Sequence, residues 1–188
     1  MTGHNYYLYL HHETRKFTWI PWDLNEAFGG FGSAGSAADQ MNLSLDRSLT
    51  NASILADRLL QMPVMKARYH EIVRGQLATN FNAGLLFPLI DAMTATIRSS
   101  LVNDPMVSLP EFDASLSELS QPEKITEKSA GQSDLRPGGM SGPGGPRQPR
   151  AALKAFINQR ATSARQQLEG KTNGYVPRAI RPGPEGGP

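Results

Sequence analysis

Two runs of strand-forming residues near the N-terminus, separated by a short polar stretch, constrain the fold more than any other feature of the chain. Residues 5–10 are rich in Tyr and Leu, and residues 17–22 read Phe-Thr-Trp-Ile-Pro-Trp. Both compositions suit a pleated, half-buried surface. The residues between them, His-His-Glu-Thr-Arg-Lys, are polar and typical of a turn. The pattern therefore predicts an antiparallel β-hairpin.

The register of this hairpin is expected to bring an amide and a carboxylate together at its open end. If Leu10 pairs with Phe17, Asn5 lies opposite Trp22 and therefore next to Asp23. Amide and carboxylate oxygens are suitable ligands for a hard cation. From the pattern alone, the alternative remains that Asn5 and Asp23 are ordinary strand-end residues that bind backbone or solvent.

The composition sets wider limits. With 188 residues, the chain is long enough for one domain with a real hydrophobic core. It has no cysteine, which excludes disulfides and thiolate metal sites. It has no uninterrupted run of eighteen apolar residues, so we predict no transmembrane segment.

The charge is unevenly distributed along the chain. Residues 1–134 contain ten Lys or Arg and fifteen Asp or Glu, whereas residues 135–188 contain nine and two. A basic tail is able to bind nucleic acid or another anionic partner. This tail has only two aromatic residues, Phe156 and Tyr175, and no compact block of Lys and Arg. Because stacking on aromatic rings supports single-strand binding, we predict no nucleic-acid partner.

Helical patterns dominate after the hairpin. The glycine-rich residues 28–36 lack the Walker lysine, so they indicate a flexible loop rather than a phosphate cradle. Residues 37–49 appear irregular in pattern, and one short helix is expected around residues 113–120. The longer helices follow from caps, prolines and apolar spacing. The first is capped by Asn51 or Ser53 and ends near Met62, and a second begins at Pro63. A third is capped by Asn80 or Asn82 and ended by Asp104-Pro105, and a last one extends from Ala151 to Glu169.

Two further segments are predicted to be disordered. Residues 136–150 contain five glycines and four prolines, too few apolar groups to offset the conformational entropy of folding. Residues 171–188 are expected to form a disordered tail. The fold class is therefore predicted to be α+β, with an N-terminal β-hairpin followed by a mostly α-helical lobe.

Several other polar and aromatic residues are also candidates for a site. His11 and His12 are expected to be solvated in the hairpin turn, with a metal role the less favoured alternative. Asp39 and Asp46 follow the glycine-rich loop and are able to approach a substrate or metal, but a loop cap is the favoured interpretation. Trp19 and Trp22 are expected to fill core space.

The chain resembles the CotH kinase family, the atypical kinases related to spore coat protein H. The resemblance spans most of residues 3–170. It rests on the following motifs: Asn5-Tyr6-Tyr7-Leu8-Tyr9, Ile20-Pro21-Trp22-Asp23-Leu24-Asn25, Phe28-Gly29, Ala56-Asp57-Arg58-Leu59-Leu60-Gln61-Met62-Pro63, Arg68-Tyr69, Phe156-Ile157-Asn158-Gln159-Arg160 and Gln167-Leu168-Glu169-Gly170.

The resemblance implies that residues 1–170 form the C-terminal lobe of a kinase domain that transfers the γ-phosphoryl of ATP to Ser or Thr of a protein substrate. That substrate is expected to be a coat or surface protein, at the spore coat or outside the cytoplasm. Asn5 and Asp23 would bind the cofactor through Mg²⁺ or Mn²⁺, as the catalytic-loop Asn and the Asp of the Asp-Phe-Gly motif do in protein kinases.

The same resemblance predicts that one role is missing. The catalytic Asp of kinases lies five residues before the metal-binding Asn, which corresponds to the position just before Met1. We therefore expect no catalytic residue in these 188 residues and no activity of the chain alone. The alternative is a non-catalytic module for coat or surface assembly.

Overall fold

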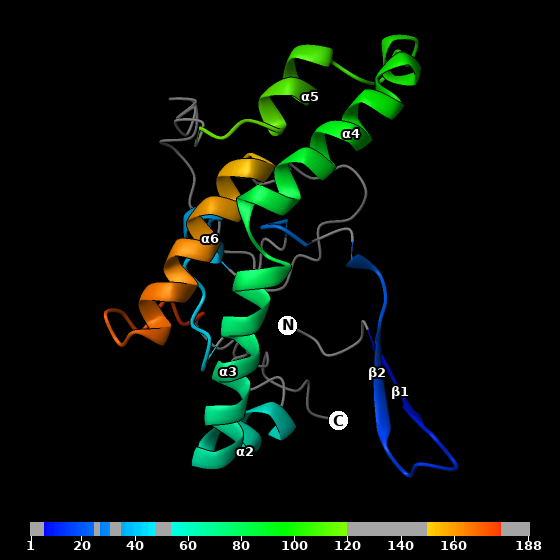
Figure 1. Ribbon diagram of the computed structural model, residues 1–188. Helices are drawn as coiled ribbons and strands as arrows, with labels where there is room; N and C mark the ends of the chain where they lie inside the picture. The colour runs from blue at the N-terminus through cyan, green and yellow to red at the C-terminus, as the bar shows by residue number, and fades with distance from the viewer. Residues whose placement is uncertain (1–5, 25–26, 31–34, 48–53, 120–149, 178–188) are drawn as a thin grey trace, which may run out of the picture.

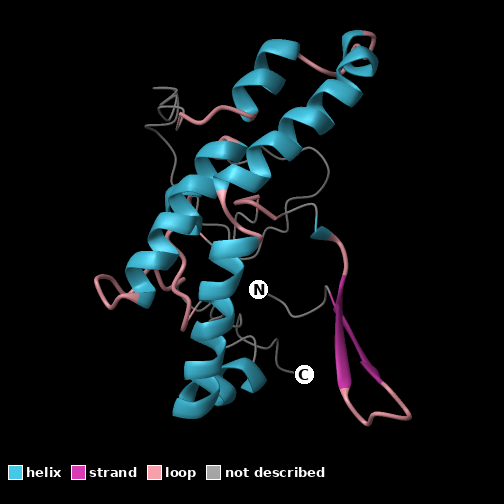
Figure 2. Cartoon of the chain, viewed as in Figure 1, coloured by secondary structure: helices cyan, strands magenta, loops and turns pink. Residues whose placement is uncertain are grey.

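The computed structural model describes residues 6–24, 27–30, 35–47, 54–119 and 150–177. These residues form one β-hairpin and six helices, which confirms the predicted α+β class (Figures 1 and 2). The elements are β1 (Tyr6–Leu10), β2 (Phe17–Pro21), α1 (Ala37–Met41), α2 (Ile54–Gln61), α3 (Pro63–Thr79), α4 (Ala83–Val102), α5 (Leu109–Ser115) and α6 (Leu153–Leu168). The Gly/Pro-rich residues 136–149 lie outside the described part.

The hairpin forms with the predicted register. Leu10 pairs with Phe17, and Tyr6 pairs with Pro21 at the other end of the ladder. The turn closes through two hydrogen bonds: the His11 amide donates to the Lys16 carbonyl, and the Arg15 amide donates to the His11 carbonyl, both at 2.9 Å. Figure 1 shows the hairpin standing apart from the helices.

Proline separates α2 from α3, as the sequence predicts. Pro63 occupies the first turn of α3, where its missing N–H group costs nothing. On α3, Leu77 is buried, whereas Met65 and Ile72 are 41% and 48% exposed. The face of this helix that carries Tyr69, Val73 and Leu77 packs against the core.

The predicted bounds of α4 are confirmed, whereas α5 begins earlier in the sequence than predicted. The Asn82 side chain caps α4 by accepting a hydrogen bond from the Leu85 amide at 3.0 Å. α5 begins at Leu109, earlier than the predicted start near residue 113, and Ser108 is its N-cap. Pro110 occupies its first turn and so favours this earlier start.

The prediction of irregular structure over residues 37–49 was wrong at its start. α1 forms because Ser36 and Asp39 make a reciprocal capping box. The Ser36 hydroxyl accepts from the Asp39 amide at 3.2 Å, and the Asp39 carboxylate accepts from the Ser36 amide at 2.9 Å. The interpretation of Asp39 as a cap is thus confirmed.

Helix α6 is the centre of the helical body. It carries most of the fully buried apolar side chains and packs against α1, α3 and α4 (Figure 1). One core cluster joins Leu45, Leu77, Ala161 and Ala164, with Tyr69, Val73, Phe81 and Leu168 partly buried around it. Segments near residues 45, 77 and 161 therefore depend on one another for burial.

Residues 171–177 are ordered, although the sequence assigns them to a disordered tail. Tyr175 forms a parallel bridge with Leu43. Its amide donates to the Asn42 carbonyl at 2.6 Å, and its carbonyl accepts from the Ser44 amide at 2.7 Å. The C-terminal segment thus returns to the chain that leaves α1.

Helix α4 has an uncharged outer face. Its 20 residues and mean hydropathy of 1.3 would suffice to span a bilayer by length and composition, and none of that stretch is buried. One such helix is weak evidence for a membrane span, and the absence of a transmembrane segment stays a prediction. The exposed apolar residues of this helix include Met93 and Ile97.

Candidate metal site at the end of the hairpin

Asp23 lies two residues beyond the last residue of β2, in an unusual backbone conformation. Its φ is +55°, in the left-handed region that non-glycine residues seldom adopt. Asp is among the residues that tolerate this region best, yet such conformations cluster at functional sites. The backbone therefore turns sharply at the residue that the sequence analysis singled out.

The hairpin supports part of the predicted geometry. The described pairs, from Leu10–Phe17 to Tyr6–Pro21, have the register from which the approach of Asn5 to Asp23 was predicted. Asn5 itself lies outside the described residues. The distance between the two side chains is therefore untested, and the metal and cofactor roles of Asn5 and Asp23 stay predictions.

The donor chemistry of the predicted pair fits a hard cation. Mg²⁺ is commonly held by one or two carboxylates together with waters and substrate phosphates, rather than by a cage of protein ligands. In the described part of the chain, no three His, Asp or Glu residues gather into a metal-binding group. Asp23 with an amide oxygen thus matches a cation that arrives with a phosphate group, rather than a structural metal.

The adjacent histidines do not form a second site with their neighbours. His11 and His12 follow β1 at the tip of the hairpin, and both are exposed. His12 lies 3.7 Å from Glu13, and both side chains are largely in solvent. The His11 ring meets Tyr9 edge to face. The expectation that the turn histidines are solvated is confirmed.

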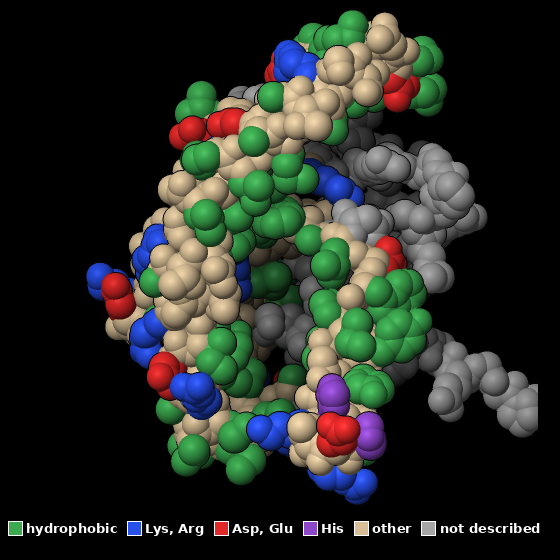
Figure 3. Space-filling view, turned by 45° about the vertical axis from the view of Figure 1, so that its right-hand side comes forward, with side chains coloured by type: hydrophobic (Ala, Val, Ile, Leu, Met, Phe, Trp, Pro, Cys, Tyr) green, Lys and Arg blue, Asp and Glu red, His purple; other side chains and the backbone are tan. Residues whose placement is uncertain are grey.

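The two tryptophans do not fill the core. Trp19 and Trp22 are 53% and 44% exposed. Instead they pair across the hairpin: Trp19 stacks on Tyr6 with ring centroids 3.7 Å apart, and Trp22 lies over Tyr7 at 6.1 Å. Figure 3 shows hydrophobic side chains covering the strands, while His and charged groups gather at the tip. The prediction failed because the core forms between helices, away from the hairpin.

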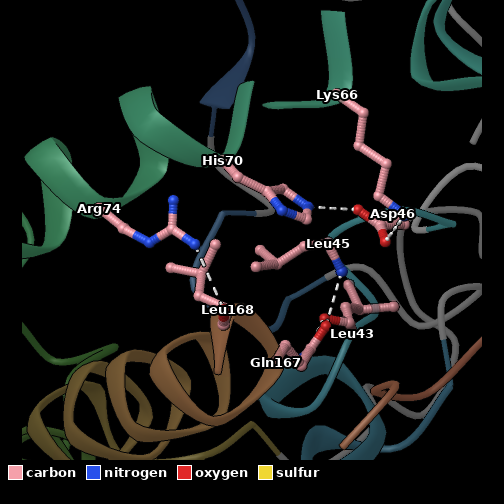
Figure 4. A network of polar contacts seen from close by, with 8 residues as sticks. All are labelled: Leu43, Leu45, Asp46, Lys66, His70, Arg74, Gln167 and Leu168. Atoms are coloured by element: carbon pink, nitrogen blue, oxygen red, sulfur yellow. Dashed lines mark hydrogen bonds and ion pairs between the residues drawn. The ribbon is translucent and has the colours of Figure 1, made fainter. Parts of the chain in front are cut away.

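Asp46 joins a polar network that the sequence analysis did not find. Its carboxylate accepts from Lys66 at 2.5 Å and contacts His70 at 2.6 Å (Figure 4). Burial raises the pKa of Asp46, but the hydrogen bonds and charges of Lys66 and His70 outweigh it, so this pKa lies below its ordinary value. Lys66 and His70 lie four residues apart on α3, a spacing that places them on one face.

The segment before Asp46 is held by α6. The Gln167 side chain accepts from the Leu45 amide at 2.8 Å and donates to the Leu43 carbonyl at 3.2 Å (Figure 4). Arg160 also donates to the Leu43 carbonyl. Burial lowers the pKa of this guanidinium, and the nearby Tyr69 offsets part of that effect. This network is structural and lies at the junction of α3, α6 and the chain after α1.

The described residues form a two-stranded hairpin, an exposed turn that carries a carboxylate, and a helical body. The comparison with known families shows the family to which a chain with this arrangement belongs. The family model described as CotH kinase protein matches residues 1–122, nearly two thirds of the chain. The chain therefore belongs to the CotH kinase family, as the resemblance predicted. No curated protein and no solved structure matches the chain.

Proposed function

We propose that this chain supplies the metal-binding part of a CotH-type protein kinase. Asp23 and Asn5 would hold the Mg²⁺ or Mn²⁺ that accompanies ATP, and the γ-phosphoryl would pass to a Ser or Thr hydroxyl of a coat or surface protein. The observation that carries the proposal is the left-handed Asp23 directly after a hairpin of the predicted register. Family membership is consistent with the same role.

The residues of this chain have a limited part in such a reaction. Asp23 and Asn5 would hold the metal ion, which would supply positive charge to offset the negative charge that develops during transfer. The Asp23 carboxylate would position that ion at a point where the backbone is already turned. Phosphoryl transfer depends mainly on such positioning and electrostatics. No residue described here is assigned the role of catalytic base.

The first test is metal and nucleotide binding by the 188-residue chain. Isothermal titration with Mn²⁺, alone and with ATP, should show that Asp23→Asn weakens binding by at least about tenfold, because the amide lacks the carboxylate charge. Asp104→Asn is the matched control, since Asp104 accepts from the Met106 amide and Asn is able to do the same. Equal affinities for the wild type and Asp23→Asn would remove the metal assignment.

The second test is phosphorylation by the gene product translated together with any sequence upstream of Met1. Asp23→Ala should abolish ATP-dependent labelling of Ser or Thr in a protein substrate, with an unchanged circular dichroism spectrum. Full activity of this variant would contradict the proposed role of Asp23.

A non-catalytic assembly module is the second candidate. It is favoured by the exposure of apolar residues on both strands, for example Tyr7 at 64% and Phe17 at 68%. Such a module would bind its partner without nucleotide and would be indifferent to Asp23→Asn. Loss of partner binding in Phe17→Ser, with retention in Asp23→Asn, would support this candidate over the kinase.

A further inference from the structure

The attachment of the hairpin to the helical body depends on few described residues. The strands contact each other extensively, and no described helix packs broadly against them. In Figure 1 the hairpin is separate from α3 and α6 along its length. Among the described residues, those that follow Asp23 connect it to the helices and therefore contribute to its position.

That chain meets α6 at Phe156. The Phe28 ring lies edge to face on the Phe156 ring, with centroids 6.0 Å apart and planes at 80°. This is a favourable aromatic geometry. Phe156 is only 8% exposed, so its ring is held by the helical body, whereas Phe28 is 44% exposed. Phe156 is therefore the fixed partner and Phe28 the residue that it holds.

The glycine after Phe28 brings the backbone itself against the same ring. Gly29 has φ +84°, and a Cβ at this position would lie 3.0 Å from Cε2 of Phe156. Phe28 also has a positive φ of +56°. Two consecutive left-handed residues thus turn the chain directly onto α6, a contact that a larger residue at position 29 would disturb.

Only a short connection separates this contact from Asp23. A hydrogen-bonded turn joins the Ala27 amide to the Leu24 carbonyl at 2.9 Å. Leu24 is the neighbour of Asp23, and Ala27 is the neighbour of Phe28. A displacement of Phe28 would therefore be transmitted through one turn to the carboxylate.

We propose that Phe156 is a positioning residue for Asp23, acting through Phe28 and Gly29. This inference rests on the proposed metal-binding role of Asp23. Phe156 lies outside the residues matched by the family model. The part of the chain beyond that match would then be required to place the metal-binding carboxylate, in addition to completing the core.

The placement of the hairpin is measurable without catalysis. The chain has two tryptophans, both in or next to β2, and no cysteine. A Thr162→Cys substitution on the exposed side of α6 would accept a single fluorescent label. Energy transfer from Trp19 and Trp22 to this label then reports the separation of the hairpin from α6 in the full chain.

Phe28→Leu is the principal variant because it removes the ring from a half-exposed position with little effect on the core. It should lower and broaden energy transfer and weaken Mn²⁺ binding about tenfold, the size expected when support for a ligand is lost. Phe156→Leu should do the same. Phe28→Tyr keeps the ring and should restore both values. Phe87→Leu, on α4, is the control that changes an equivalent ring away from the hairpin.

Wild-type energy transfer and Mn²⁺ affinity in both Phe28→Leu and Phe156→Leu would overturn the proposal. An equal loss in Phe87→Leu would also overturn it, because the effect would then come from general destabilisation. The proposed function fails separately: if Asp23→Asn binds Mn²⁺ as the wild type does, the metal assignment is wrong. Energy transfer in the Phe28 variants would still decide whether Phe156 positions the hairpin.

Discussion

Two glycines in this chain lie in different environments. Substitution of each by Ala should therefore change the free energy of unfolding in opposite directions. Gly75 is in α3, with no atom within 4 Å of a Cβ at that position. Gly75→Ala should therefore raise the free energy of unfolding by up to about 1 kcal/mol, through higher helix propensity. Gly29→Ala should lower it by about 1–2 kcal/mol, because φ is +84° and Phe156 occupies the space.

Urea unfolding monitored by circular dichroism measures both glycine variants. Each carries the same chemical change, so the wild type is a sufficient common reference. A stabilising Gly29→Ala would show that the close approach to Phe156 is not maintained in solution.

The Asp46 network should make stability depend on acid. Because the folded pKa of Asp46 lies below its ordinary value, its contribution is present above the unfolded pKa, near 3.9, and is lost as the pH falls through the folded pKa. Asp46→Asn should lower stability by about 1 kcal/mol at pH 7, a modest value because the carboxylate is partly exposed. The difference in the free energy of unfolding between Asp46→Asn and the wild type should disappear below about pH 4.

Urea titrations at pH 7, 5 and 3 test this dependence, with Asp104→Asn as a carboxylate control on the surface. A gap that stays constant from pH 7 to pH 3 would exclude Asp46 as a source of the acid sensitivity. A similar loss at pH 7 in Asp104→Asn would show that the effect is not specific to the network.

Residue-level prediction succeeded where the signal was local. The pairing of Leu10 with Phe17 was expected from two strand-forming runs around a polar turn, and Asp39 was expected to be a cap because it follows the glycine-rich loop. The contacts of Asp46 were not predicted, because they join segments on different elements. The i, i+4 spacing of Lys66 and His70 was the available signal, but it does not identify the carboxylate between them.

Helix α6 holds the chain after α1 through two side chains, Arg160 and Gln167, and Gln167 makes the larger number of these hydrogen bonds. Its Oε1 accepts from the Leu45 amide at 2.8 Å, and its Nε2 donates to the Leu43 carbonyl at 3.2 Å and to the Ser163 hydroxyl at 3.0 Å. Gln167→Met keeps the length but removes these bonds. It should lower the free energy of unfolding by about 1–3 kcal/mol, because partly buried backbone groups lose their partners.

Thermal unfolding of Gln167→Met is best compared with Gln166→Met. Gln166 is the exposed neighbour on the same helix, so its substitution repeats the change without the network. Equal melting temperatures for the two variants would contradict the assigned role of Gln167.

At the scale of elements, the sequence predicted the long helices well and the short ones poorly. Pro63, Asn82 and Gly170 mark helix ends by conformational rules that need no tertiary information. α1 and α5 are only five and seven residues long, too short for a clear apolar period. Apolar spacing identifies a face of a helix such as α4 but does not show whether another element covers it.

The whole molecule depends on residues far beyond the family match. α6 contributes Ala161 and Ala164 to the core cluster that also contains Leu45 and Leu77. A polypeptide ending at residue 122 should therefore lose cooperative unfolding, since Leu45 and Leu77 would have no apolar partner from α6. Calorimetry should detect no sharp transition. A cooperative transition close to that of the full chain would show that the family-matched part folds independently.

The C-terminal segment provides a finer test at the same scale. A chain ending at Asn173 loses Tyr175, and with it two backbone hydrogen bonds to the segment after α1. It should be less stable than a chain ending at Pro177 by about 2 kcal/mol. Comparable stability of the two truncated chains would show that the Tyr175 bridge contributes little.

The contact between α6 and the distant segment around Leu45 also has a consequence for synthesis on the ribosome. Leu45 and Gln167 are separated by 122 residues. The hydrogen bond between the Leu45 amide and the Gln167 side chain therefore cannot form until residue 167 has been translated. At roughly 5–20 residues per second, this delay is on the order of 6–24 s. During that interval the face of α3 that packs against α6 is exposed in the nascent chain. We expect the growing polypeptide to bind chaperones that recognise extended apolar segments, and slowing translation before residue 167 should increase aggregation.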